Sequence, residues 1–401
     1  MKQFWTLCMN GALVAVLGLI DSAFGNNMGV DAIIVIASWG TLYYLFHKIA
    51  QFGDCCYQCD PSKFTLGFII NSVSSVAAGL LMVLLSSFMS GLFDITDAQR
   101  ELLVKCTVIY GLGLPFARTE SIFNKYLILT GQNKKLIGAT VAFYIVMISW
   151  DAVCFILRVP CYYLILGTIV SDIFTILYYL VVCKCYKGFV KPDWHGTKEF
   201  LSKGFFMWLE RMGNAVAYFA GSVIASYFGE TEYAIHSVCI GIAGSTEDVT
   251  DCWCQNQIVQ LQHVKLVDKY AVFKREARRS FLPCAVVSFV LAFGLFIPMK
   301  GELPLGVTFK FLCLYLSQIV FLCPYENYRG FIASLGYTKC MPLNMFIGTA
   351  IRLVWAVICV STPLGLYGFA FMISGCFTIR GLMYHVAVKR KFGNVFETSS
   401  L

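Results

Sequence analysis

The chain has 401 residues, of which 58% are hydrophobic and only 13% are charged, and its mean hydropathy is +0.71. A water-soluble core cannot bury that much apolar surface, so the composition excludes a soluble globular protein and indicates an integral membrane protein. The formal net charge of +8 does not indicate nucleic-acid binding, because the basic residues concentrate in alternate loops, as membrane insertion requires.

Apolar runs of about 20 residues, the length that crosses a bilayer as a helix, divide the chain into about twelve predicted spans. The spans are expected to begin near Trp5, Val30, Phe64, Leu102, Leu136, Tyr162, Phe200, Tyr233, Phe281, Val307, Pro342 and Gly365. Their linkers are too short for a soluble catalytic domain, and the sequence lacks the Gly-rich loop ending in Gly-Lys-Ser/Thr that binds ATP. We therefore predict an all-α membrane protein that is not an enzyme and has no catalytic residues and no cofactor.

The basic residues also predict which loops face the cytoplasm. Lys134 and Lys135 follow the fourth span, five lysines from Lys184 to Lys203 surround the sixth-to-seventh connection, and Lys389 to Lys391 lie near the end of the chain. The positive-inside rule then makes both termini cytoplasmic. We expect a monomer in the cytoplasmic membrane, surrounded by lipid, that handles a small organic molecule and no nucleic acid.

Two glycine-centred stretches recur about half a chain apart. Residues 20–25 (IDSAFG) resemble residues 224–229 (IASYFG), an offset of 204, and residues 131–134 (GQNK) resemble residues 336–339 (GYTK), an offset of 205. Membrane transporters are commonly built from two repeats with the substrate path between them. The predicted organisation is an N-terminal six-helix lobe over 1–187, a cytoplasmic linker over 188–203, and a pseudo-symmetric six-helix lobe over 204–401.

Three aspartates lie inside predicted spans of the first half: Asp21, Asp151 and Asp172. A carboxylate in hydrocarbon costs several kcal/mol unless it is paired, protonated or in contact with water. Acids that converge within one lobe could hold and release a proton or a sodium ion. The alternative is that Asp21 and Asp151 only lie near headgroups at the outer helix ends.

Further charges lie within spans of both halves. Arg118, Glu120 and Lys125 lie in the fourth span, and Glu326 and Arg329 in the tenth, which nearly corresponds to the fourth under the repeat. They could line a central substrate cavity from opposite sides, or only neutralise partners on adjacent helices. The second lobe also carries these acidic and basic residues: Glu210, Arg211, Glu247, Asp248 and Asp251.

The densest cysteine cluster is Cys55, Cys56 and Cys59, in a segment predicted to be a cytoplasmic loop. Disulfides are rare in that compartment. A metal site would need a fourth ligand, for which His47 is the only nearby candidate, so ordinary use of cysteine as a small apolar residue is the favoured interpretation and no metal is expected.

The opening of the chain, with Asp21 followed by Phe24-Gly25 and then 28–32 (MGVDA), resembles the multidrug and toxic compound extrusion (MATE) family. The stretch from 113–116 (GLPF) to 129–134 (LTGQNK), and its second copy ending in 336–342 (GYTKCMP), are similar to that family's fourth and tenth helices with their cytoplasmic turns. The resemblance implies that Asp21 and Asp151 form a cation-coupling cluster, with Asp172 or Ser171 nearby. It also implies that Glu210 or Asn214 corresponds to a seventh-helix polar residue of other branches.

Together these observations predict a secondary antiporter that is driven by H⁺ or Na⁺. It would export amphipathic drugs, expected to be cationic, by alternating access between its lobes. A flippase for a lipid-linked precursor is the alternative, in which Arg118, Arg211, Lys125 and Arg329 would bind phosphates. Predominantly cationic side chains in the cavity would favour the flippase, and exposed carboxylates the drug exporter. A membrane transferase that uses His236 or His385 is a remote third.

Overall fold

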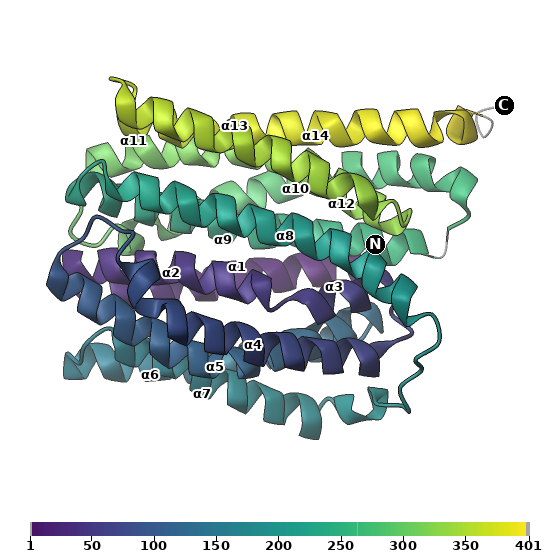
Figure 1. Cartoon of the computed structure of the whole chain (residues 1–401), viewed down its shortest axis with the longest axis horizontal. Helices are drawn as coiled ribbons and strands as arrows, with labels where there is room; N and C mark the ends of the chain where they lie inside the picture. The colour runs from purple at the N-terminus through teal and green to yellow at the C-terminus, as the bar shows by residue number, and fades with distance from the viewer. Residues whose placement is uncertain (1, 263, 398–401) are drawn as a thin grey trace.

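The structure, a computed structural model, describes residues 2–262 and 264–397, and describes side chains at all of these except 2–8, 247–248, 252–253, 255–256, 262, 280, 295, 373–374 and 393–397. Every long regular element in this part of the chain is an α-helix, and the helices run roughly side by side along the longest axis of the molecule (Figure 1). The prediction of an all-α chain is therefore confirmed.

The first half contains α1 (Lys2–Asn26), α2 (Val30–Ile49), α3 (Phe52–Cys59), α4 (Phe64–Ser90), α5 (Asp97–Leu129), α6 (Asn133–Leu157), α7 (Tyr162–Val181) and the short 3-10 helix η1 (Cys185–Gly188). The second half contains α8 (Thr197–Ser226), α9 (Glu230–Gln262), α10 (Leu266–Met299), α11 (Leu305–Leu316), α12 (Gln318–Ser334), the 3-10 helix η2 (Thr338–Cys340), α13 (Met341–Ser361) and α14 (Gly365–Glu397).

The twelve predicted spans correspond to these helices when α3 is left out and α11 and α12, which are separated only at Ser317, count as one. Within the described residues, ten of the twelve are long and apolar enough to cross a membrane by composition alone. The other two are α8 and α9, whose apolar runs are interrupted by charged residues. The chain is a multi-pass membrane protein.

Three segments differ from the sequence-based expectation, because helices extend beyond the apolar runs. Helix α10 begins at Leu266 rather than near Phe281, since its charged first turns contain no glycine or proline. Helix α8 begins at Thr197, inside the predicted linker. The cysteine-rich segment is helix α3 rather than a loop. It packs closely on α8, where a Cβ added to Gly204 would lie 2.6 Å from the Cα of Cys56.

The turns at the ends of the paired helices support an internal repeat but correct its register. Gly29 (φ 113°) precedes α2 and Gly229 (φ 117°) precedes α9, both with a backbone conformation that favours glycine. Their offset is 200 residues, whereas Gly25, the predicted counterpart of Gly229, lies within α1. Gly131 (φ 73°) and Gly336 (φ 67°) keep the predicted offset of 205. The two halves therefore differ by a few residues between these turns.

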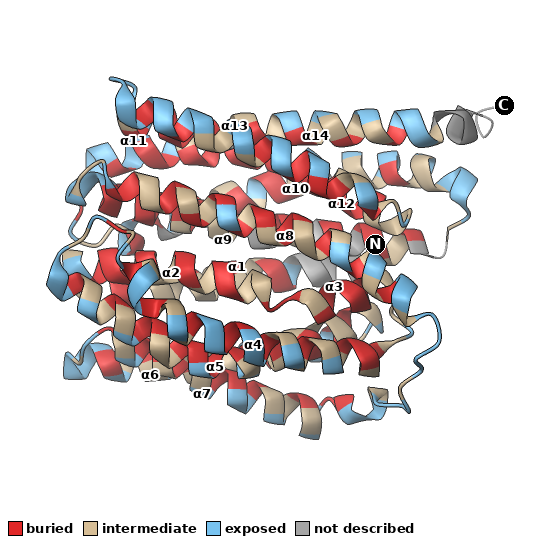
Figure 2. Ribbon diagram, in the orientation of Figure 1, coloured by how far each residue is buried: buried red, intermediate tan, exposed pale blue. Residues whose placement is uncertain are grey.

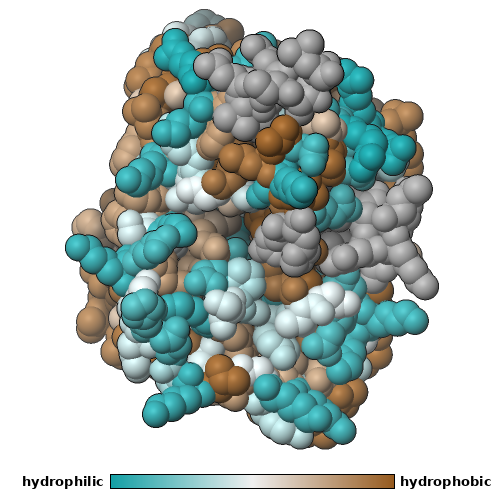
Figure 3. All heavy atoms as spheres, turned by 90° about the vertical axis from the view of Figure 1, so that its right-hand side faces the viewer, coloured by the Kyte–Doolittle hydropathy of each residue, from teal (hydrophilic) through white to brown (hydrophobic). Residues whose placement is uncertain are grey.

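The surface of the bundle suits a bilayer. Exposed residues alternate with buried ones along the outer helices (Figure 2), and many of the exposed ones are large and apolar, such as Leu84 and Ile156. Hydrophilic residues gather over the end of the molecule shown in Figure 3, and hydrophobic residues flank that end at its sides. An apolar flank with a polar end is the pattern expected of a protein surrounded by lipid.

Candidate functional site

A cavity of about 640 Å³ lies between the two halves and is lined by helices from both. Its lining extends along α2 from Ile33, near the first turn, to His47 and Lys48 in the last turn, and continues to Gln51. The charged side chains in the lining are Asp21, Lys48, Lys125, Arg211, Asp251, Glu326, Arg329, Arg352 and Arg380. The described part of the lining thus contains six basic and three acidic residues.

The structure brings Asp21 and Asp151 together. Asp21 on α1 lines the cavity, and Asp151 on α6 is fully buried behind it. The two carboxyl groups are close enough to influence each other electrostatically. Neither oxygen of Asp151 has a hydrogen-bond partner among the described groups. A proton or a small cation between two such carboxylates would relieve their mutual repulsion.

Asp172 lies apart from this pair. It is buried on α7, and the charged groups that act on it are Glu120 and Arg118 rather than Asp21 or Asp151. Glu120 accepts a hydrogen bond from the hydroxyl of Tyr179 at 3.0 Å. Ser171, the alternative to Asp172, donates to the backbone oxygen of Gly167 on its own helix at 2.7 Å. Asp172 and Glu120 are outside the described cavity lining.

Arg118 is also outside the lining, in a buried ion pair. Its guanidinium contacts the carboxylate of Asp54 on α3, and neither side chain is exposed. Asp54 accepts a second hydrogen bond from Ser121 at 2.9 Å, and Nη1 of Arg118 lies 2.6 Å from Nε2 of His47. Of the two roles that the sequence left open for Arg118, its contacts support neutralising a partner on an adjacent helix rather than lining the cavity. Asp54 was missed because it lies in the segment interpreted as a loop.

Glu210 forms a second buried ion pair, with Arg380 on α14 at 2.7 Å. Tyr325 donates to the same carboxylate oxygen at 2.6 Å, and Asn214 donates to it at 3.1 Å. Arg380 also contacts the side-chain oxygen of Asn214. Asn214 and Arg380 line the cavity, whereas Glu210 lies behind them. The guanidinium therefore occupies the position at which Glu210 could otherwise bind an external cation.

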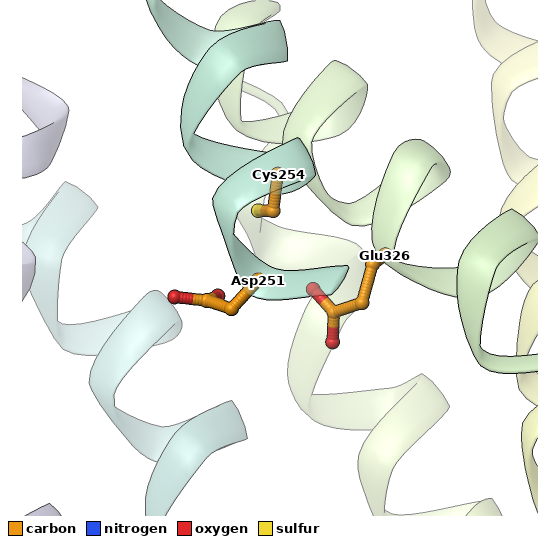
Figure 4. A group of neighbouring side chains, drawn as sticks. All are labelled: Asp251, Cys254 and Glu326. Carbon is orange, nitrogen blue, oxygen red and sulfur yellow. The ribbon is translucent and has the colours of Figure 1, made fainter. Parts of the chain in front are cut away.

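The polar residues of the tenth span form a third cluster, shown in part in Figure 4. Arg329 donates to Glu326 at 2.8 Å and to Asp251 on α9 at 2.6 Å. Ligand atoms of Asp251, Cys254 and Glu326 lie within 4.8 Å of one another, close enough to hold a metal ion. A divalent cation would, however, compete with the guanidinium of Arg329 for both carboxylates. The side chains of Glu247 and Asp248 lie outside the described residues.

No family model and no curated protein matches the sequence. Solved structures match nearly the whole chain. One is the inward-facing conformation of a multidrug resistance MATE family transporter of the MOP superfamily, at 15% identity over 98% of this chain and 99% of that chain, with a TM-score of 0.72. Another is a complex of the MATE multidrug transporter DinF-BH, at 13% identity over 99% of this chain and 96% of that chain, with a TM-score of 0.74. The chain has the MATE fold.

A third structure with the MATE fold is a MOP superfamily transporter from Pyrococcus furiosus, at 16% identity over 98% of this chain and 96% of that chain, with a TM-score of 0.69. Its binding pocket is described as having reverse polarity, which suggests a different function for that protein. The similarity confirms the predicted fold class of twelve membrane-spanning helices. The three solved structures named above are described as transporters.

Within this MATE fold, only part of the cavity was predictable from the sequence. Of the seven predicted cavity residues, the structure places four in the lining: Lys125, Asn214, Glu326 and Arg329. Lys48, Arg352 and Arg380 also line it but were not predicted. Each is a cation within an apolar helix, and that property by itself marks a candidate functional residue in a membrane protein.

Proposed function

We propose that the chain is a secondary transporter that exports amphipathic organic molecules in exchange for H⁺ or Na⁺, by alternating access to the central cavity. The cavity between the two halves supports a substrate path, and the adjacent acids Asp21 and Asp151 support coupling to a cation. The second observation is the decisive one, because a gradient-driven transporter needs a group that binds and releases the driving ion.

Coupling would follow if the cation and the substrate favour different arrangements of the helices in the first half. A proton or sodium ion shared by Asp21 and Asp151 removes the repulsion between them and favours one packing of α1 against α6. Since Asp21 also lines the cavity, substrate and cation act on the same helix. A difference in cation affinity between the two packings is sufficient to link ion entry to substrate exit.

The sequence and the cavity favour substrates of different charge. The sequence favoured a cationic drug, and aromatic residues such as Trp39, Tyr44 and Tyr218 do line the cavity. The described lining nevertheless contains six basic residues against three acidic ones. That excess favours the alternative, a flippase for an anionic lipid-linked precursor. Both candidates use the same cavity and the same coupling pair.

The remaining parts of the proposal concern the surroundings of the transporter. We place it in the cytoplasmic membrane with both termini inside, because the basic loops then follow the positive-inside rule. It would act as a monomer, without nucleic acid and without a cofactor other than the transported ion. The small-molecule substrate and the lipid bilayer would be its partners.

The test is gradient-driven transport in proteoliposomes. Purified protein is reconstituted, a pH or sodium gradient is imposed, and transport of two fluorescent probes, cationic ethidium and anionic 1-naphthyl phosphate, is followed. The double variant Asp21→Asn, Asp151→Asn is expected to lose gradient-driven transport of whichever probe the wild type moves. The wild type should show movement of H⁺ or Na⁺ that depends on that probe.

The matched control is Asp94→Asn, the same chemical change at an exposed aspartate near the outer end of the bundle. It should transport as the wild type does. Wild-type rates in the Asp21, Asp151 double variant would eliminate this pair as the coupling site.

A further inference from the structure

Arg211 on α8 is a buried cation that faces the cavity. Only 6% of the residue is exposed, and it lines the cavity near its inner end. Nη2 donates to the side-chain oxygen of Gln58 on α3 at 2.9 Å, while the buried Nε has no hydrogen-bond partner among the described groups. A buried guanidinium normally has an anionic partner, because desolvating an unpaired charge is unfavourable.

Lys48 supplies a second cation in the same part of the cavity. Its helix, α2, is joined to α8 by a hydrogen bond from the indole of Trp208 to the backbone oxygen of Ile49 at 2.9 Å. Trp208 is one turn from Arg211, and Ile49 follows Lys48. The ammonium of Lys48 lies 4.8 Å from the ring centroid of Tyr44 and lines the cavity beside it.

The nearby acids are held by other cations. Within the described chain, no carboxylate comes within salt-bridge distance of Lys48 or Arg211, whereas Arg329 contacts both Asp251 and Glu326. Glu210, next to Arg211 in sequence, contacts Arg380. Lys48 and Arg211 are thus cavity cations to which no described carboxylate is bound.

An aromatic wall continues outward from these cations. Arg211, Asn214, Tyr218 and Ser222 lie at helical spacing on one face of α8, and all line the cavity. The rings of Tyr218 and Tyr44 are edge to face, with centroids 5.4 Å apart. The guanidinium of Arg352 lies 5.9 Å from the Tyr218 centroid, so the wall has a further cation beyond it.

We propose that Lys48 and Arg211 form an anion-binding subsite, and that the substrate is an amphipathic anion whose phosphate or carboxylate occupies it. The apolar part of the substrate packs along Tyr44 and Tyr218. Guanidinium binds two oxygens of such a group side by side, and the lysine adds a mobile third donor. The inference rests on the proposed function, because it specifies the substrate of the same cavity.

The test is equilibrium binding of 1-naphthyl phosphate to the purified full-length protein in detergent, with no ion gradient. Its neutral counterpart, 1-naphthol, measures the apolar contribution. The phosphate should bind at least tenfold more tightly than the naphthol, a difference of about 1.4 kcal/mol. Lys48→Gln and Arg211→Gln should each weaken binding of the phosphate about tenfold or more and leave binding of the naphthol unchanged. Lys48→Arg should retain most of the affinity.

The control variant is Arg278→Gln, which removes an exposed arginine of α10 outside the cavity lining and should bind as the wild type does. Equal affinity for the phosphate and the naphthol would overturn the proposal. So would wild-type affinity in both Lys48→Gln and Arg211→Gln, or a lack of binding of the phosphate. Since the side chain of Lys48 makes no hydrogen bond within the described chain, its variant is expected to fold.

A polyprenyl phosphate added as competitor identifies the source of the anion. Displacement of 1-naphthyl phosphate indicates a lipid-linked substrate, and failure to displace it indicates a soluble one; both results retain the subsite. Measuring binding of 1-naphthyl phosphate to the Asp21→Asn variant separates this proposal from the coupling proposal. If the phosphate binds but transport does not depend on an ion gradient, only the coupling proposal is refuted. If transport depends on the gradient but the phosphate does not bind at Lys48 and Arg211, only the proposal of an anionic substrate is refuted.

Discussion

The buried ion pair of Arg118 and Asp54 predicts a large loss of stability when one charge is removed. Both side chains are fully buried, and Asp54 also accepts a hydrogen bond from Ser121. Asp54→Asn leaves the guanidinium of Arg118 buried without a carboxylate. Breaking one member of such a pair costs about 3–5 kcal/mol. We therefore expect the free energy of unfolding to fall by about that amount.

The measurement is unfolding of the purified protein by titration with SDS at constant pH, followed by circular dichroism. The control is Asp97→Asn, which breaks the 2.7 Å pair with Arg100 at the surface, where the side chains of Arg100 and Asp97 are 38% and 97% exposed. Exposed pairs contribute about 0–1 kcal/mol. The contrast between the two variants isolates the effect of burial from that of the amide substitution.

A double variant, Asp54→Asn with Arg118→Gln, completes the test. Because both charges are then absent, its loss should be smaller than the sum of the single losses, by about 1–3 kcal/mol. The reasoning is refuted if Asp54→Asn costs no more than Asp97→Asn, or if the two single losses simply add.

Two further predictions concern the end of the bundle at which α2, α5 and α9 begin. The side-chain amide of Gln99 donates to Asp31 of the first half at 2.7 Å and to Glu230 of the second half at 2.8 Å. Gln99→Leu should therefore leave two facing carboxylates and favour outward opening. Faster labelling of a Ser22→Cys variant by an impermeant maleimide added outside would show this opening, and an unchanged labelling rate would contradict it. Gly229→Ala should lower the free energy of unfolding by about 1–3 kcal/mol, because φ is 117° and the new Cβ would lie 2.9 Å from Glu232 Oε2. Gly241→Ala, in open space within α9, should be neutral or stabilising, and equal losses for the two alanine variants would contradict the strain argument.

The membrane-spanning helices could be predicted from the sequence because the bilayer limits the possible folds. Apolar length marked the start of α2, α4, α7 and α14 to the residue. It failed at the inner start of α10, where the helix continues into a charged segment, since apolar length carries no information outside the membrane. It also failed at α3, whose eight residues depend on packing against α8 rather than on local propensity.

The site was less predictable, because a charged residue within a span does not reveal which residue it contacts in the folded protein. Asp21 and Asp151 are 130 residues apart, yet the packing of α1 on α6 makes them neighbours. Arg118 and Glu210 looked like cavity residues, but each has a buried partner from a distant segment, Asp54 and Arg380. Of the two predicted repeat pairs, Gly131 and Gly336 keep their offset. The other pair fails because residues 20–25 and 224–229 are alike in composition but occupy different places in their helices.

The buried arginines of the second half also limit how many acidic residues could bind a driving ion, and therefore the free energy available for transport. Glu210 is paired with Arg380, and Asp251 and Glu326 share Arg329. Among the described acids that line the cavity, Asp21 is the one that contacts no arginine, and under the proposed function one monovalent ion exchanges with the medium at its pair with Asp151. A single charge moving through about 100 mV supplies about 2.3 kcal/mol, enough for an accumulation ratio of about 50. That ratio applies to an uncharged substrate exchanged for one ion, whereas an anion that leaves as the cation enters moves a second charge through the same voltage.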